Sequence, residues 1–244
     1  MSRFHSVTIP AIILSIVLCS CAQRGTCGAG DSVPSIPEGE FTYNLPCKVV
    51  GIHQEKKGKS IMFLWLHGGV HDTSKHDFYG YNHLDCCDAD DSVLCYLNNK
   101  GIKAIALFPL CHLAEVGHPV DWADCYEDVR RIMDDYISKG MIDTDRIYLA
   151  GSSDGGCGTW DFVEEHEDIF AAAMPMSCER PRKCTIPVYF FNTSDEEDCT
   201  AAVDSLRAEG YTNISYKRCY DQPHGGDATE CTVELLDRYF SHTR

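Results

Sequence analysis

One short stretch of the chain has the residue types and spacing for nucleophilic catalysis by a serine. Gly151, Ser153 and Gly155 form a G-x-S-x-G pattern, which follows the apolar run 147–150 and precedes a segment that can be helical. A serine on a sharp turn between a strand and a helix projects its hydroxyl, and the flanking glycines let the two elements approach closely. We therefore take Ser153 as the candidate nucleophile. A three-position pattern arises by chance in roughly one such chain in ten, so the interpretation depends on its context.

A serine hydroxyl is a poor nucleophile unless a base takes its proton and a carboxylate orients that base. Three histidines follow Ser153 in the chain. His166 falls within the segment expected to be helical and His242 lies near the chain end, whereas His224 lies in a polar loop. His224 is therefore the candidate base.

The acid is expected directly after the apolar strand 187–191, in the sequence FNTSDEED. Asp195 is the first choice, because a carboxylate at the carboxyl edge of a strand, before a helix, is best placed to reach the base. Glu196, Glu197 and Asp198 are competitors in the same loop. Ser153, Asp195 and His224 then follow one another in the chain order Ser, acid, His.

A second glycine pair follows the apolar strand 61–66, in the sequence HGGV at 67–70. It resembles the oxyanion-hole loop of esterases and lipases, where a backbone N–H joins that of the residue after the nucleophile. The donors here would be Gly69, or Val70, and Asp154. The alternative is a turn that merely needs two glycines. Only the backbone of Asp154 is required, but its carboxylate would oppose a developing oxyanion if it pointed inward.

These residues must be positioned by alternating strands and helices. Apolar runs predict strands at 47–53, 61–66, 102–110, 147–150, 170–176, 187–191 and 214–218, and helices are expected at 91–99, 122–139 and 199–209. This alternation predicts an α/β fold with a mostly parallel sheet, helices on both faces and no large cap domain. The polar turn 54–60 is expected to connect the first two strands as a hairpin.

Two runs of sequence resemble a known family. IYLAGSSDGGCGTWDFVEEHEDIFAAAMPMSC looks like the elbow of polyhydroxybutyrate-depolymerase-like and "predicted peptidase" esterases, which are similar to the feruloyl and acetyl-xylan esterases of carbohydrate esterase family 1. IPVYFFNTSDEEDCTAAVDSLRAEG resembles the acid strand and helix of the same family, with Asp195 at its aspartate. The resemblance covers residues 45–244.

The resemblance implies an α/β-hydrolase fold and a serine esterase that works through an acyl-enzyme, without metal or organic cofactor. Acetyl or feruloyl esters on polysaccharide would be its substrates. The chain departs from the family at Phe191 and Asn192, where His-Gly is usual, and at Asp154, where Met or Asn is usual. The alternative is a non-catalytic binding lipoprotein on a hydrolase scaffold.

The N-terminus has the pattern of an export signal. The apolar run 9–18 is too short to span a bilayer as a helix and is typical of a signal-peptide core. The sequence LCSC that ends at Cys21 resembles a bacterial lipobox, so we expect a signal at 1–20, a lipid on Cys21, a tether at 21–44 and a periplasmic or cell-surface domain at 45–244. An ordinary signal peptide cleaved nearby is the alternative.

Charge restricts the partners. The formal net charge of -16 would repel nucleic acid and anionic lipid, so the expected partner is an ester-bearing small molecule or polysaccharide, with membrane contact only through the lipid. The histidines and cysteines of 71–91 lack metal-ligand spacing and are more typical of a substrate-facing or disulfide-stapled loop.

The chain has 15 cysteines, and export would make disulfides possible. Cys178 with Cys184, and Cys27 with Cys47, are candidate pairs that sequence cannot establish. Cys157 is expected to be a buried helix residue, since it lies one turn past Ser153.

Overall fold

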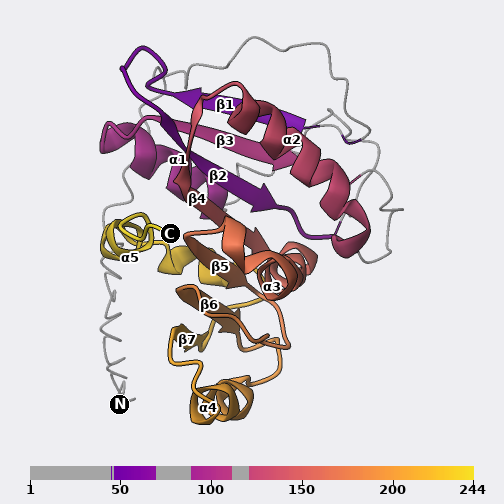
Figure 1. The fold of residues 1–244 in the computed structure, drawn as a ribbon. Helices are drawn as coiled ribbons and strands as arrows, with labels where there is room; N and C mark the ends of the chain where they lie inside the picture. The colour runs from indigo at the N-terminus through magenta and orange to yellow at the C-terminus, as the bar shows by residue number, and fades with distance from the viewer. Residues whose placement is uncertain (1–44, 46, 70–88, 112–120) are drawn as a thin grey trace, which may run out of the picture. The chain divides into compact units, whose positions relative to one another are not determined.

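A computed structural model of the protein describes residues 45, 47–69, 89–111 and 121–244. Its centre is a sheet with the strand order β1-β3-β2-β4-β5-β6-β7 (Figure 1). The strands are β1 (Cys47–Ile52), β2 (Ser60–Leu66), β3 (Ala104–Pro109), β4 (Ile142–Ser152), β5 (Ala172–Met176), β6 (Val188–Thr193) and β7 (Ile214–Cys219). All neighbouring pairs are parallel except β1 with β3. The mostly parallel sheet expected from the sequence is confirmed.

The expected hairpin between the first two strands is wrong. β1 pairs antiparallel with β3, with Val50 opposite Ala106, and β2 lies between β3 and β4. Every residue of β2 is buried, whereas β1 has the partly exposed Lys48 and Val49. A strand that is buried along its whole length is best covered when both its edges are paired with parallel neighbours, so the more exposed strand takes the edge of the sheet.

Helices cover both faces of the sheet, as expected (Figure 1). They are α1 (Ala89–Asn99), α2 (Tyr126–Ser138), α3 (Asp154–His166), α4 (Thr200–Ala208) and α5 (Val233–Tyr239), with the short 3-10 helices η3 (Ala123–Cys125), η4 (Glu167–Ile169) and η5 (Gly226–Glu230). Alternate residues of β2 point to opposite cores: Leu64 packs in the cluster that includes residues of α2, α3 and α4, and Phe63 in the cluster that includes residues of α1 and α5.

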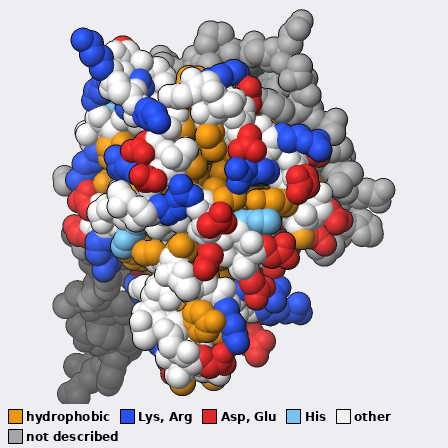
Figure 2. Space-filling view, viewed as in Figure 1, with side chains coloured by type: hydrophobic (Ala, Val, Ile, Leu, Met, Phe, Trp, Pro, Cys, Tyr) orange, Lys and Arg blue, Asp and Glu red, His pale blue; other side chains and the backbone are white. Residues whose placement is uncertain are grey.

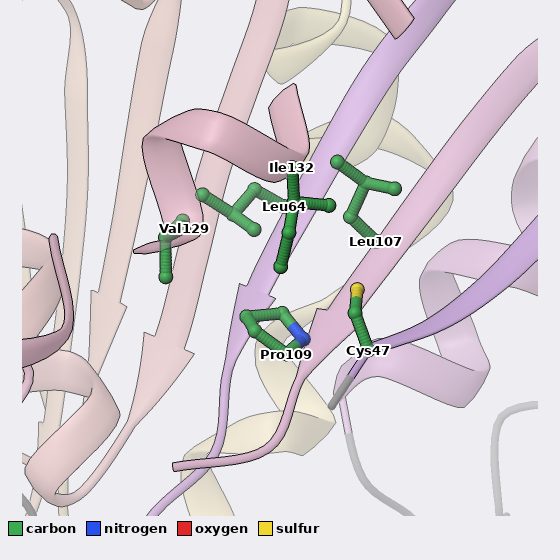
Figure 3. A pocket seen from close by; sticks show the side chains of 6 residues that line it. All are labelled: Cys47, Leu64, Leu107, Pro109, Val129 and Ile132. Atoms are coloured by element: carbon green, nitrogen blue, oxygen red, sulfur yellow. The ribbon is translucent and has the colours of Figure 1, made fainter. Parts of the chain in front are cut away.

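One apolar pocket lies where α2 packs on the sheet. Figure 3 shows its lining, which consists of Cys47, Leu64, Leu107, Pro109, Val129 and Ile132. The thiol of Cys47 is the most polar side-chain group there, and burial raises its pKa to about 12. The thiol therefore stays protonated at neutral pH, and this pocket offers packing rather than chemistry.

The surface mixes charges of both signs. On the face seen in Figure 2, basic and acidic side chains are interspersed over the described residues, with apolar side chains between them. None of the helices within the described residues is long and apolar enough to cross a membrane.

Candidate active site

The turn between β4 and α3 aims the side chain of Ser153. Its backbone has φ 59° and ψ −122°, a conformation that residues other than glycine rarely adopt. The turn is fixed on both sides, since the N–H of Ser153 donates to the carbonyl of Met176 at 2.9 Å and the N–H of Cys157 donates to the carbonyl of Ser153 at 3.0 Å. The strand–turn–helix order expected around Ser153 is therefore present, with the strained residue at the serine itself.

The glycines of the motif are required by close backbone approach. A Cβ added at Gly151 would overlap the carbonyl of Gly155, and one added at Gly155 would overlap the carbonyl of Leu66. In the neighbouring loop, a Cβ at Gly68 would lie 2.9 Å from the Cβ of Ser153. The turn, the start of α3 and the end of β2 are thus packed too closely for any side chain at these positions.

Ser153, His224 and Glu196 form one continuous line of hydrogen bonds. His224 Nε2 lies 3.0 Å from Ser153 Oγ, and His224 Nδ1 lies 2.6 Å from Glu196 Oε1. The three residues follow the carboxyl ends of β4, β6 and β7, which meet at one edge of the parallel sheet. A carboxylate that accepts from Nδ1–H leaves Nε2 as the acceptor for the serine proton, which is the arrangement that activates a serine.

The expectation of Asp195 as the residue that orients the imidazole is wrong in this structure. Asp195 Oδ2 accepts a hydrogen bond of 2.9 Å from the backbone N–H of His224, while its neighbour Glu196 contacts the ring. Asp195 is exposed and the Glu196 side chain is only 7 % exposed. The reason is local: the turn after β6 directs residue 196 inward, where its longer side chain reaches the imidazole.

Glu196 is itself held in place by the end of β6. Its Oε2 accepts hydrogen bonds from the backbone N–H of Thr193 and, at 2.7 Å, from the Thr193 hydroxyl. Arg218 Nη2 donates to the backbone carbonyl of Glu196 at 3.1 Å. Both oxygens of the carboxylate therefore have donors, and the carboxylate is positioned before any substrate arrives.

The loop that carries His224 is fixed by contacts from two neighbouring strand ends. The N–H of Gly225 donates to Ser177 Oγ at 2.8 Å, just past β5. Ser194 Oγ, just past β6, donates to the carbonyl of Gln222 at 2.9 Å. Neither serine was identified from the sequence, because a Ser after a strand has no signature that separates it from an ordinary loop residue.

The His-Gly-Gly loop is held by the ring of His67. The N–H of Cys111 donates to His67 Nε2 at 3.0 Å, so the proton of the neutral ring is on Nδ1, which lies 2.6 Å from the carbonyl of Gly68. Burial lowers the pKa of His67, with the Gly68 hydrogen bond and the charge of Asp154 opposing that effect. His67 is thus a neutral residue that shapes the loop.

Trp122 joins this loop to α3. Its indole N–H donates to the carbonyl of His67 at 3.0 Å, and its ring meets that of His67 edge to face, with centroids 4.9 Å apart. A Cβ at Gly158 would lie 2.5 Å from the Cβ of Trp122. The sequence indicated Trp122 only as the start of a helix, because nothing in its spacing marks a contact 55 residues away.

The carboxylate of Asp154 lies beside the expected oxyanion loop. A Cβ built on Gly69 would be 3.3 Å from Asp154 Oδ2, so the side chain reaches across from α3 toward that glycine. Val70, the other expected donor, lies outside the described residues. The structure thus places Gly69 and Asp154 together next to Ser153, with a carboxylate close to the backbone that would hold an oxyanion.

The cysteines near the site differ from expectation. Cys157 is exposed rather than buried, and the thiol of Cys178 hydrogen-bonds to it, which lowers the pKa of Cys157 to about 7. Cys178 therefore contacts Cys157 instead of Cys184, whose thiol interacts with Asn213 Nδ2 at 3.7 Å. The expected pairing of Cys178 with Cys184 is wrong in this structure.

Other expected features lie beyond the described residues. They are Cys21 and Cys27, the signal and tether at 1–44, and most of the loop 71–91. Cys47, the expected partner of Cys27, is described and has a free, buried thiol, so that pairing is wrong in this structure. Within the part of the chain that the structure describes, no group of three or more His, Cys, Asp or Glu side chains is arranged to hold a metal ion.

Sequence comparison gives a short match around the elbow. The model of the prolyl oligopeptidase family matches residues 121–178, which include α2, β4, Ser153 and α3. Among curated protein sequences, none matches the chain significantly.

Several solved structures resemble this one. A thermostable esterase has a TM-score of 0.61 and 18% identity, covering 86% of this chain and 62% of its own, so the chain spans less than two thirds of that esterase. The feruloyl esterase module of Clostridium thermocellum, a mutant complexed with sinapinate, has a TM-score of 0.56 and 14% identity over 80% of this chain and 83% of its own.

The fluorophosphonate-binding serine hydrolase F of Staphylococcus aureus has a TM-score of 0.55 and 13% identity, covering 80% of this chain and 91% of its own. Identities this low compare folds rather than activities. The strand order, the strained turn after β4 and these similarities together show that the chain has the α/β-hydrolase fold.

Proposed function

We propose that the protein is a serine hydrolase that cleaves carboxylic esters through an acyl-enzyme. The observation that carries the proposal is the hydrogen-bonded line from Ser153 Oγ through His224, 3.0 Å from Nε2, to Glu196, 2.6 Å from Nδ1. Such a line serves no obvious purpose in packing, because the His224 side chain is 52 % exposed.

The chemistry follows from the two ends of the imidazole. Ser153 Oγ attacks the ester carbonyl while His224 Nε2 takes its proton, and Glu196 stabilises the imidazolium that forms. His224 then gives the proton to the departing alkoxide, which leaves an acyl group on Ser153. A water molecule then gives a proton to His224 Nε2 and attacks that acyl group. His224 returns the proton to Ser153 Oγ as the bond to the acyl group breaks, and the acid leaves. Each step moves one proton through one nitrogen, without a metal or organic cofactor.

The tetrahedral intermediate of each step carries negative charge on the former carbonyl oxygen. The backbone N–H groups of Gly69 and Asp154 are the proposed donors to it, because both flank Ser153 and the second opens α3. The close approach of Gly68 to Ser153 supports this assignment, since it brings the loop within reach of a bound carbonyl.

The proposed substrates are acetyl or feruloyl esters on polysaccharide. This is supported by the family resemblance of the sequence and by the fold shared with a feruloyl esterase module. The strands β2, β3 and β4 are parallel, so they end at the same edge of the sheet. The segments that follow β2 and β3 in the sequence, 70–91 and 111–121, are therefore expected to shape the substrate pocket. Hydrolysis of peptides, in keeping with the short prolyl oligopeptidase match, is the competing activity.

Covalent labelling with a fluorophosphonate tests the proposal most directly. The wild-type chain should carry one adduct on the peptide that contains Ser153, and Ser153→Ala should carry none. A non-catalytic binding protein on the same scaffold would show no Ser153-dependent adduct, and that result would refute the enzyme. Kinetics on acetyl, feruloyl and short-chain aryl esters, with a peptide amide in parallel, would then identify the substrate class.

The proposed location is outside the cytoplasmic membrane, with the domain tethered through a lipid on Cys21. Growth of an expressing bacterium with an alkyne-tagged fatty acid should label the wild-type chain, and Cys21→Ser should abolish the label. A cleaved, unlabelled wild-type chain in the medium would instead indicate an ordinary signal peptide.

A further inference from the structure

Two buried cysteines meet behind the His-Gly-Gly loop. Cys111 Sγ and Cys125 Sγ are 3.0 Å apart, and both residues are only 2% exposed. Cys111 lies two residues past the end of β3, and Cys125 is the last residue of η3, immediately before α2. The two sulfurs are therefore brought together by segments on either side of residues 112–120.

Each cysteine belongs to a segment that holds His67. The backbone N–H of Cys111 donates to His67 Nε2 at 3.0 Å. Trp122, three residues before Cys125, donates from its indole to the carbonyl of His67 at 3.0 Å. A covalent bond between the two cysteines would therefore connect the two segments that hydrogen-bond to His67, in the loop that precedes Gly69.

We propose that Cys111 and Cys125 form a disulfide when the protein folds under oxidising conditions. A disulfide bond is about 2.05 Å long, so the sulfurs need to approach by only about 1 Å. Both side chains are already directed at one another across a buried space, so we expect little movement of the backbone.

The reaction is a thiol–disulfide exchange with an external disulfide, such as glutathione disulfide or the disulfide of an oxidoreductase. One cysteine loses its proton and attacks the external disulfide, which releases one thiolate and leaves a mixed disulfide. The second cysteine, once deprotonated, displaces the other external thiolate and closes the bond. Two protein thiols lose two electrons and two protons, and the external disulfide becomes two thiols.

The pair should close during folding rather than afterwards. The hydrogen bond with Cys111, followed by burial, raises the pKa of Cys125 far above its ordinary value. A buried thiol of this kind is protonated and inaccessible in the folded protein, and it becomes reactive only while the chain is open. The experiment therefore starts from the reduced, unfolded chain.

Trypsin provides a specific readout. Cleavage after Lys103 and Arg130 gives the peptide 104–130, in which the cysteines are Cys111 and Cys125 and no others. The full chain is reduced, unfolded, refolded in a buffer of glutathione and glutathione disulfide, checked by far-UV circular dichroism, and then alkylated with iodoacetamide in denaturant without reduction.

The proposed bond gives a peptide 104–130 that is two hydrogens lighter than the dithiol and carries no alkyl group. Reduction before alkylation should restore two alkyl groups on it. Two alkyl groups without reduction, or a cross-link from either cysteine to another peptide, would overturn the proposal. This readout comes from the wild-type chain and does not depend on any variant folding, nor on whether Ser153 is catalytic.

The bond should also stabilise the fold. Closing a loop of this length restricts the unfolded chain, and the Tm of the oxidised protein should exceed that of the reduced protein by roughly 5–10 °C. Cys125→Ser, refolded in the same buffer, should have no bond within peptide 104–130. The difference in Tm between its oxidised and reduced forms should be smaller than in the wild type, by the amount that this bond supplies. An undiminished difference in that variant would assign the stabilisation to other cysteines and contradict this part of the proposal.

Discussion

Glu196 accepts a hydrogen bond from the ring of His224, with 2.6 Å between Oε1 and Nδ1, and its neighbour in sequence contacts only the backbone of the same histidine. Asp195 Oδ2 lies 2.9 Å from the N–H of His224. One carboxylate thus controls the charge and orientation of the imidazole, while the other anchors the loop that carries it. Because the two roles are divided between separate side chains, mutation can distinguish them.

Replacing Glu196 by glutamine should lower kcat by about 10³- to 10⁴-fold, the scale seen when the triad acid of a serine protease becomes an amide. A neutral amide cannot stabilise the imidazolium of His224. Asp195→Asn should lower kcat less than about tenfold, because its amide oxygen can still accept from the backbone N–H. Kinetics on an aryl ester would measure both. A larger loss for Asp195→Asn than for Glu196→Gln would contradict the assignment of Glu196.

Asp154→Asn should raise kcat/KM by about tenfold or more. The carboxylate of Asp154 lies beside Gly69, and two negative charges about 5 Å apart repel by roughly 3 kcal/mol at an effective dielectric constant near 20. Asparagine keeps the shape and removes the charge from beside the oxyanion. Asp135→Asn removes a charge from α2, where Asp135 pairs with Lys139, and should leave the rate unchanged. A slower Asp154→Asn enzyme would show that this carboxylate assists the reaction, for example by binding a cationic group of the substrate.

Gly155→Ala should prevent stable folding or cost more than about 3 kcal/mol of unfolding free energy, because the new Cβ would overlap the carbonyl of Leu66. Gly140→Ala is the matched control. Gly140 has φ +69° and nothing within 4 Å of its Cβ position, so the substitution should cost only about 1–2 kcal/mol of backbone strain. Urea unfolding followed by circular dichroism would compare the two. Equal costs would mean that the close approach to Leu66 adds no penalty at position 155, and would contradict the role given to it.

The sequence predicted those parts of the structure that depend on local pattern. The apolar run of β2 and the glycines around Ser153 indicated a buried parallel strand and a strand–turn–helix, because burial on both faces and close backbone approach restrict the residue types directly. His224 was identifiable because the other histidines after Ser153 lie in a helix or at the chain end. Each of these features can be predicted from the residue types in its own segment of the sequence.

Features that depend on pairing over long distances could not be predicted in the same way. The partner of β1 is β3 rather than the next strand, since pairing depends on which edge remains uncovered after the other strands assemble. Whether Glu196 or Asp195 contacts the ring of His224 depends on the turn after β6, because neighbouring residues in this turn direct their side chains differently. The contact of Cys111 with Cys125 likewise exists only after β3 and η3 are placed.

Cys157 should react with iodoacetamide at a rate that rises with pH and is half-maximal at about 7, because the thiolate is the reactive form and the pKa of Cys157 is lowered to about 7. The hydrogen bond from Cys178 is the largest cause, so Cys178→Ala should move the half-maximal rate to higher pH. Mass spectrometry of the labelled peptide would give the rate, and Cys157→Ser should remove this fast phase. A midpoint that is unchanged in Cys178→Ala would contradict the role of that hydrogen bond.

His67 should make the fold less stable as the pH falls below about 6.5. Burial lowers its pKa from the ordinary value of 6.5, so between the folded and unfolded pKa values the unfolded chain binds the extra proton, and stability is lost as pH decreases through this window. Protonation would also break the hydrogen bond from Cys111 N–H to Nε2.

Thermal unfolding between about pH 5 and 7.5 should therefore show a steeper fall in Tm for the wild type than for His67→Gln, whose amide does not titrate. Burial also lowers the pKa of His242, but this residue is present in both proteins and contributes a similar fall in Tm to each. His242→Gln is therefore the parallel control, and it should keep the part of the fall that His67 causes. Equal slopes for the wild type and His67→Gln would show that the ring of His67 is not held neutral in the folded protein.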